Sequence, residues 1–496
     1  MRLFICLTTF IFALSACNDQ SRESTDSISK HEPLAMTSTL PSPTIIGPVS
    51  KGIRNQPWGS ATESQPLDNY DYVEEEYFFE GSAKARDITA TETGQEAFYR
   101  SRMIVRRPKE PKNFNGTVLV EWFNDSGFMD LPVMWVLAHE EILGEGYAYV
   151  GVSAQVVGVQ SSPFSLKLWD PIRYGSLDHP GDEYAHDIFG QSAKALLPSK
   201  SNIPVLGPLN PKSIVAMGES QSCSLLSQYR NSVHQEHNVF DGYLLHSCNS
   251  NLTPEVSAPT ILFMNESEVT GFYSPQSTLL KTLGVLPNFL TDIPGLESAR
   301  LGKIQQENGS APSRDGDFFR VWEITGGTHF DRQALADLLP LLLNNLTAPL
   351  PPLLSLPELP VGCLKLPNQL GMERPTRAAL NQLHQWVTFG KPGKTYNRLL
   401  IDNEGNLKRD EQDIALGGIR LPTISEPYGA NRGDDCPFIG SFSPFSKAEL
   451  QQEYTSKHDY LRALTTAITD SINKGYLLPR DGDLYLLEAE QEITAW

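Results

Sequence analysis

The sequence predicts an α/β protein with a mostly parallel sheet and helices on both faces. From about residue 72 onward, apolar runs rich in β-branched and aromatic residues alternate with helical patterns, which is typical of such sheets. The chain of 496 residues is 40% hydrophobic and 20% charged, so it can bury a large core. The formal net charge is −19 without a Lys/Arg cluster to offset it, and this argues against a nucleic-acid partner.

The N-terminus predicts export and attachment to a membrane by lipid alone. Residues 1–16 contain the Arg, the short apolar run and the small residues of a signal peptide, and the run is too short to span a bilayer. Residues 14–17, Leu-Ser-Ala-Cys, resemble the lipobox of bacterial lipoproteins, which implies that Cys17 is acylated and becomes the mature N-terminus. Ordinary cleavage with release into the periplasm is the alternative.

Three regions follow the signal peptide. Residues 17–57 are rich in Ser, Thr and Pro and lack periodicity, which predicts a disordered tether after the lipidated cysteine. Residues 58–347 contain the strand and helix patterns of the core. Residues 348–496 begin with a Leu/Pro-rich crossing that cannot be one helix, and continue with amphipathic helices. We expect this last region to pack on the core as a helical cap or extension.

Eight segments are strand candidates. The first two are joined by polar residues and should form an antiparallel hairpin, whereas helical patterns separate most of the others. The candidates are residues 72–83, 98–106, 117–123, 147–153, 213–217, 240–246, 259–264 and 318–324.

Helical stripes occupy the spaces between the strands and much of the C-terminal region. One stripe runs from Leu131 to Ile142 and should stop at Gly144 or Gly146. Two amphipathic stripes in the C-terminal region should end at Gly390 and Gly475, because glycine readily adopts the left-handed conformation that terminates helices.

The strand at residues 213–217 leads into Gly-Glu-Ser-Gln-Ser and then a helical stretch. Strand, tight turn and helix in this order are the context of a nucleophile elbow, and small residues at Gly218 and Ser222 let the strand and helix approach closely. The pattern predicts that Ser220 is a nucleophile at the carboxyl edge of the sheet. A serine that only caps the helix is the alternative.

A serine nucleophile needs a base, which follows it in the sequence when it stands on such an elbow. His329 lies in a Gly-Gly-Thr-His loop directly after the last strand candidate, where it can reach the elbow, so we expect it to be the base. His384 and His458 lie on or beside amphipathic helices and should be solvated. Alternatively, His329 only precedes the start of a helix near Asp331.

The acid of a triad is expected after the strand at residues 259–264, where Glu266 and Glu268 stand. Two residues apart, they are separated by roughly 6.6 Å in extended chain, so one of them can meet the imidazole. The position a few residues beyond the strand favours Glu268, and Glu266 stays open as the alternative. The acid would hold the histidine tautomer and stabilise the imidazolium.

Two backbone N–H groups should form an oxyanion hole. Gln221, directly after the nucleophile, is expected to supply one. The other should come from Asn124 or Asp125, after the strand at residues 117–123. A plain β-turn before the next helix is the alternative for that loop.

Four cysteines remain once Cys6 is removed with the signal peptide and Cys17 carries lipid. Their spacing fits no zinc site, and we expect no metal. Disulfides persist in exported proteins. Of three possible connectivities we favour the one that pairs Cys223 with Cys248 and Cys363 with Cys436; free buried thiols are the alternative for the first pair.

Several motifs together resemble a large bacterial family of α/β-hydrolase domain proteins, from about Tyr72 to the C-terminus. The resemblance implies the α/β-hydrolase fold and a serine hydrolase of undefined substrate, and the final Ser of the elbow also fits it. Arg173 and Tyr174 lie near the expected mouth and are candidate pocket residues, unless Arg173 pairs internally with Asp170 or Asp182. The motifs are residues 120–124, 170–177, 179–182, 218–222 and 241–243.

The combined pattern predicts hydrolysis of a small-molecule or polymeric carboxylic ester through an acyl-enzyme. Ser220 would attack, His329 would move the proton and Glu268 would orient the imidazole, without a metal or organic cofactor. A surface binding protein of the same fold that has lost turnover is one alternative. Cleavage of amides or lactones, or acyl transfer by the same residues, is another.

Overall fold

The computed structural model describes residues 38–492 except 63–64, 66, 88, 198–201, 271–314, 346–364 and 437. The predicted signal peptide at residues 1–16, Cys17, Cys363 and the Pro-rich crossing that begins at residue 348 lie outside the described residues. In the described part, no helix is long and apolar enough to cross a membrane.

A nine-stranded sheet forms the centre, with strand order β1-β2-β3-β5-β4-β6-β7-β8-β9. The six strands from β5 to β9 in this order are parallel, and β1, β2 and β3 are antiparallel to their neighbours. The predicted mostly parallel α/β class is confirmed, as is the hairpin of the first two predicted strands. The strands are β1 Thr44–Ile46, β2 Tyr72–Arg86, β3 Glu92–Pro108, β4 Thr117–Trp122, β5 Ala148–Val152, β6 Ser213–Glu219, β7 Gly242–His246, β8 Thr260–Asn265 and β9 Phe319–Ile324.

The ninth strand, β1, corrects both the predicted strand number and the predicted extent of the tether. Thr44–Ile46 lies within the tether that the sequence predicts to be disordered, residues 17–57, but it pairs with β2 at Glu80, Phe79 and Phe78. Ile45 is buried, and the Asn202 side chain bonds both the N–H and the C=O of Ile45. Three residues are too few for a period-2 pattern to stand out from a Ser/Thr/Pro-rich background.

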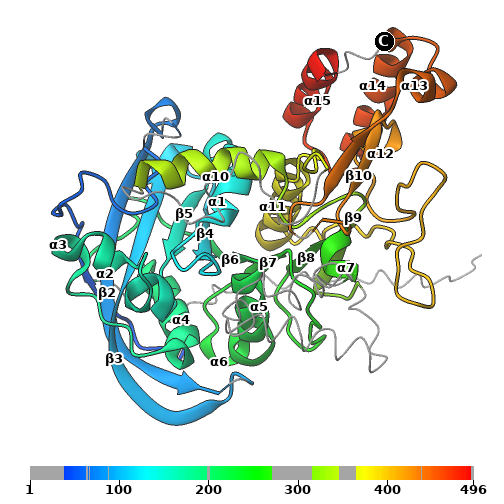
Figure 1. Cartoon of the computed structure of the whole chain (residues 1–496). Helices are drawn as coiled ribbons and strands as arrows, with labels where there is room; N and C mark the ends of the chain where they lie inside the picture. The colour runs from blue at the N-terminus through cyan, green and yellow to red at the C-terminus, as the bar shows by residue number, and fades with distance from the viewer. Residues whose placement is uncertain are drawn as a thin grey trace, which may run out of the picture. The chain divides into compact units, whose positions relative to one another are not determined.

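Helices cover the two faces of the sheet, as Figure 1 shows. Side chains alternate along each strand, so Val215 and Met217 of β6 enter the core beneath α1, α10 and α11, whereas Ile214 and Ala216 enter the core beneath α4 and α5. The covering helices are α1 Val133–Gly144, α10 Arg332–Asn345 and α11 Glu373–Phe389 on one face, and α4 Ala185–Ala195, α5 Gln221–Gln228 and α6 His234–His237 on the other.

Glycine ends the helices where the sequence predicted. α11 and α14 (Lys457–Lys474) are followed by Gly390 and Gly475, both left-handed, and α1 ends at Gly144.

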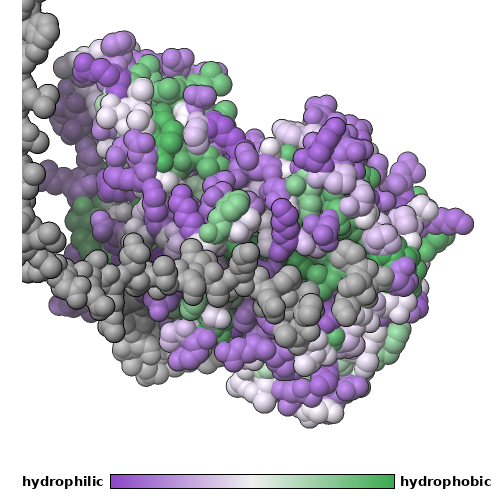
Figure 2. All heavy atoms as spheres, turned by 180° about the vertical axis from the view of Figure 1, so that it is seen from behind, coloured by the Kyte–Doolittle hydropathy of each residue, from purple (hydrophilic) through white to green (hydrophobic). Residues whose placement is uncertain are grey.

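On the face seen in Figure 2, hydrophilic residues cover most of the surface, and hydrophobic residues lie between them in smaller groups.

Part of the C-terminal region packs into the core of the sheet, as expected for an extension, whereas residues 450–489 contain a separate hydrophobic cluster. Leu383 of α11 is buried in the core on the α1 face, and a β-carbon on Gly242 of β7 would lie 2.7 Å from Val387. The prediction of helices alone is incomplete, because a hairpin of β10 and β11 is also present. The remaining elements are α2 Leu166–Trp169, α3 Pro171–Tyr174, α7 Glu266–Thr270, α12 Pro422–Ser425, β10 Gly429–Arg432, β11 Ser441–Pro444, α13 Lys447–Glu453, α14 Lys457–Lys474 and α15 Pro479–Glu492.

One disulfide joins the core helix α5 to the segment after β7. It links Cys223 to Cys248, which is the first of the two predicted pairs. Both residues are buried. The second predicted pair includes Cys363, which lies outside the described residues.

Removing this cross-link should destabilise the fold without changing its architecture. The disulfide spans a sequence separation of 25 residues, and closing a loop of that length in the unfolded chain is worth about 3 kcal/mol. Cys223→Ala/Cys248→Ala should lower the free energy of unfolding, measured by denaturant titration, by about this amount. Oxidised wild-type protein is the reference, and an unchanged transition in the double variant would contradict the prediction.

Candidate active site

The turn between β6 and α5 holds Ser220 in a strained backbone conformation. Its φ of 57° and ψ of −115° are unusual for a non-glycine residue, and such strain persists only where the surroundings enforce it. Here the N–H of Ser220 donates to the His246 carbonyl at 2.9 Å. A β-carbon on Gly218 would lie 3.0 Å from the Ser222 backbone, so a larger residue would force the strand and helix apart.

Ser222 stands where many nucleophile elbows have glycine, and its hydroxyl has a bonding role. It accepts from the Glu219 N–H at 3.0 Å and donates to the Glu219 carbonyl at 2.9 Å. The small side chain therefore fits the close approach of strand and helix, and it also fixes the residue before Ser220.

The structure brings Ser220, His329 and Glu268 into one hydrogen-bonded chain. Ser220 Oγ lies 2.8 Å from His329 Nε2, and His329 Nδ1 lies 2.8 Å from Glu268 Oε1. Ser220 follows β6 directly, Glu268 lies in α7 after β8, and His329 follows β9, so the three residues come from the carboxyl edge of the parallel strands. In this arrangement Nδ1 donates to the carboxylate and Nε2 can accept the serine proton.

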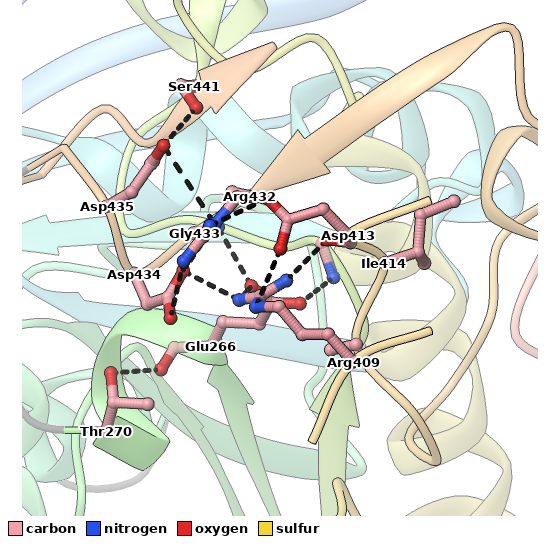
Figure 3. A network of polar contacts seen from close by, with 12 residues as sticks. Glu266, Thr270, Arg409, Asp413, Ile414, Arg432, Gly433, Asp434, Asp435 and Ser441 are labelled. Carbon is pink, nitrogen blue, oxygen red and sulfur yellow. Dashed lines mark hydrogen bonds and ion pairs between the residues drawn. The ribbon is translucent and has the colours of Figure 1, made fainter. Parts of the chain in front are cut away.

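Glu266, the alternative acid, faces away from this chain. Its Oε1 accepts from the Gly326 N–H at 2.7 Å, and its Oε2 accepts from Arg409 at 2.8 Å and from the Gly433 N–H at 3.0 Å, as Figure 3 shows for Arg409 and Gly433. The open choice between the two glutamates is therefore resolved by contact, and the Glu266 alternative is wrong.

Burial and neighbouring charges set the protonation of the histidine and its acid. Burial alone would raise the pKa of Glu268, but the hydrogen bond and charge of His329, with bonds from Ser267 and the Asn265 N–H, bring that pKa below its ordinary value. Burial likewise opposes charging of His329, yet the carboxylates of Glu219 and Glu268 raise its pKa overall. The site therefore stabilises an ionised carboxylate and an imidazolium.

Glu219 is a site residue to which the sequence reasoning assigned no role. Its Oε1 lies 3.3 Å from His329 Nε2, the atom that also contacts Ser220, and its Oε2 accepts from the Asn124 side chain at 3.0 Å. Burial raises the pKa of Glu219 to about 7. Its place directly before the nucleophile was the available signal, because the side chain of that residue must lie near the turn.

The predicted oxyanion loop lies beside the elbow, but Asn124 does not fit the role given to it. The N–H of Asn124 donates to the Leu131 carbonyl at 3.1 Å, so that prediction is wrong. The N–H of Asp125 lies 3.3 Å from the Gln221 side-chain oxygen, which brings together the other two predicted donor residues. Gln221 is the first residue of α5, and the first N–H groups of a helix have no acceptor within the helix itself.

Arg173 and Tyr174, the candidate pocket residues, are both buried and make internal contacts. Both bond the Glu76 carboxylate of β2, Arg173 at 3.0 Å and Tyr174 at 2.8 Å. The Asp170 side chain also accepts from the backbone N–H of Arg173 at 3.0 Å. The internal pairing that was the alternative is present as a contact of 4.0 Å between Arg173 Nε and Asp170 Oδ2, with Glu76 as an additional partner that the sequence did not indicate.

The other two downstream histidines lie elsewhere. His384 is buried on α11 and bonds the Thr117 hydroxyl at 2.9 Å, so the expectation that it is solvated is wrong, whereas His458 is exposed. Asp331 accepts from the Ala334 N–H at 2.9 Å at the start of α10, so the helix start near Asp331 coexists with the site role of the preceding loop. The described residues contain no cluster of three or more His, Cys, Asp or Glu suited to a metal.

Comparison with known proteins identifies the family but not the substrate. A family model described as "Alpha/beta hydrolase domain" matches residues 45–486. No curated protein matches the chain. The similar solved structures have low identities and TM-scores, so we infer nothing about activity from them. They include esterase Est22 (16% identity, 57% of this chain and 70% of that chain, TM-score 0.30) and esterase B from Lactobacillus rhamnosis (13%, 57% and 76%, TM-score 0.25).

Removing the charge of Glu219 should make His329 easier to deprotonate. Glu219→Gln keeps the side-chain shape but removes a carboxylate that favours the imidazolium, so the pKa of His329 should fall. An NMR titration of ¹⁵N-histidine-labelled protein measures this, with the His329 signal assigned by its loss in His329→Gln. Glu121→Gln, which alters a buried carboxylate bonded to α1 instead, is the control. An identical His329 titration in wild type and Glu219→Gln would contradict the interpretation.

Proposed function

Because the chain belongs to the alpha/beta hydrolase domain family, we propose that it is a serine hydrolase that cleaves carboxylic esters through an acyl-enzyme. The observation that carries the proposal is the chain of contacts from Ser220 Oγ through the two nitrogens of His329 to Glu268, each 2.8 Å long. A serine hydroxyl becomes nucleophilic at neutral pH when a neutral imidazole at this distance can take its proton.

Acylation begins when Ser220 Oγ attacks the carbonyl carbon of the ester and its proton moves to His329 Nε2. Glu268 stabilises the imidazolium, and we expect the N–H groups of Gln221 and Asp125 to donate to the developing oxyanion, that of Asp125 in place of its bond to the Gln221 side chain. The tetrahedral intermediate collapses as the alcohol leaves with the proton from Nε2. The acyl group then remains on Ser220.

Deacylation repeats these steps with water as the nucleophile. His329 takes a proton from the water, which attacks the acyl carbon, and the proton then returns to Ser220 Oγ as the carboxylic acid departs. Glu219 favours the imidazolium in both halves, because its carboxylate lies against the same nitrogen.

We also propose that the enzyme is exported and held at a membrane by lipid on Cys17, as the N-terminal motif implies. The disulfide between Cys223 and Cys248 supports export, because such bonds persist in oxidising compartments and are rare in the cytosol. Substrates would then be esters of the cell envelope or its surroundings.

A fluorophosphonate probe tests the proposed nucleophile directly. The wild-type protein should be labelled on the peptide that contains Ser220 and should hydrolyse p-nitrophenyl acetate and butyrate. Ser220→Ala should abolish labelling and lower turnover by a factor on the order of 10³ or more. Ser224→Ala removes a nearby hydroxyl on α5 and serves as the control. Folded wild-type protein that is neither labelled nor active would indicate a binding protein instead.

Cell fractionation tests the anchor. Wild-type protein should sediment with membranes and be released by detergent, whereas Cys17→Ala should shift most of it to the soluble fraction. Cys6→Ala changes a cysteine within the predicted signal peptide and should not alter the distribution. Equal membrane association of the wild type and Cys17→Ala would refute lipid attachment at this residue.

A further inference from the structure

The C-terminal region reaches into the neighbourhood of the candidate active site. Phe438 lies edge-on to the His329 ring, with centroids 5.7 Å apart, and its carbonyl accepts from the Phe330 N–H at 2.8 Å and the Thr328 hydroxyl at 3.0 Å. The Asn368 side chain donates to the Gly326 carbonyl at 2.7 Å. Residues more than 35 positions beyond His329 in the sequence therefore hold its loop.

Glu266 connects this loop to the helix that carries the proposed acid. Its N–H donates to the Gly327 carbonyl at 3.1 Å, and its Oε1 accepts from the Gly326 N–H at 2.7 Å. Glu268 lies two residues later in α7, and His329 lies two residues after Gly327. The two bonds of Glu266 thus fix the relative position of the segments whose side chains meet at 2.8 Å.

Arg409 and Gly433 hold the same carboxylate from the side of the C-terminal region. Arg409 Nη2 donates to Glu266 Oε2 at 2.8 Å, the Gly433 N–H donates at 3.0 Å, and Arg409 is itself held by Asp434 at 2.7 Å (Figure 3). A β-carbon on Gly433 would lie 1.7 Å from the Gly327 carbonyl oxygen, so the two backbones are in direct contact.

The charge of Arg409 makes this arrangement possible. Glu266 is fully buried, and a buried carboxylate without a cation is costly. Ionised, it accepts from Gly326, Gly433 and Arg409 at once. A protonated carboxyl group would lose acceptor capacity and weaken these bonds, which would loosen the histidine loop.

We propose that Arg409 is a positioning residue for the proposed hydrolysis, acting through Glu266 to hold the histidine loop against the acid. The inference rests on the proposed function and assigns the C-terminal region a part in the active site. Arg409 touches none of the triad side chains, so its effect should fall on the rate of the chemical step rather than on substrate binding.

Paired arginine variants test this role. Arg409→Met should lower kcat for p-nitrophenyl acetate by about 10- to 100-fold, the loss expected when a catalytic group is displaced by about 1 Å, with KM within about twofold. The rate of fluorophosphonate labelling should fall in parallel. Arg432→Met is the matched control, because Arg432 bonds Asp434 and Asp413 in the same network, whereas Arg409 is the arginine that bonds Glu266, and it should keep kcat within about twofold.

Arg409→Lys covers the case in which Arg409→Met does not fold. It keeps the positive charge but cannot reach Glu266 and Asp434 with the same planar group, so it should fold and lose less activity than Arg409→Met. A wild-type kcat in folded Arg409→Met or, if that variant does not fold, in Arg409→Lys, measured well below each melting temperature, would overturn the role of Arg409. Absence of turnover in the wild type would instead refute the proposed function.

Discussion

The candidate active site depends on the contact between Ser220 Oγ and His329 Nε2, which joins loops at the ends of two parallel strands. The serine stands in a strained turn directly after β6. The histidine follows β9, which lies three strands away from β6 in the sheet. Because parallel strands end at one edge of the sheet, residues more than a hundred positions apart meet there without a special loop architecture. The strain at Ser220 is maintained by the bonds of its own N–H and of Ser222.

Three buried glutamates near His329 illustrate how surroundings assign different tasks to one residue type. Glu268 is kept ionised by the imidazole it orients, whereas burial raises the pKa of Glu219 to about 7 beside the other nitrogen. Burial also raises the pKa of Glu266, and Arg409 opposes that rise. The partner of each carboxylate, rather than its proximity in sequence to the strand end, determines what it contributes.

Local patterns predicted eight of the nine strands of the central sheet and the three residues that meet in the hydrogen-bonded chain, but they missed β1 and the hairpin of β10 and β11. Ser220, His329 and Glu268 each follow a strand with a clear apolar pattern, and strand order along the chain limits which loops can meet. Residues whose roles depend on distant partners could not be predicted. Arg173 binds Glu76, nearly a hundred residues earlier, and Arg409 binds Glu266, 143 residues earlier. The prediction that Asn124 supplies an oxyanion donor was wrong because its N–H donates to the Leu131 carbonyl instead, a contact that the sequence does not reveal.

The proposed mechanism requires that Ser220 carries an acyl group during turnover. Rapid acid quenching after mixing with p-nitrophenyl butyrate, followed by proteolysis and mass spectrometry, measures this directly. The acyl-enzyme mechanism predicts a butyryl adduct on the peptide containing Ser220, formed together with an initial burst of p-nitrophenol. Release of p-nitrophenol with the adduct on a different residue would contradict it.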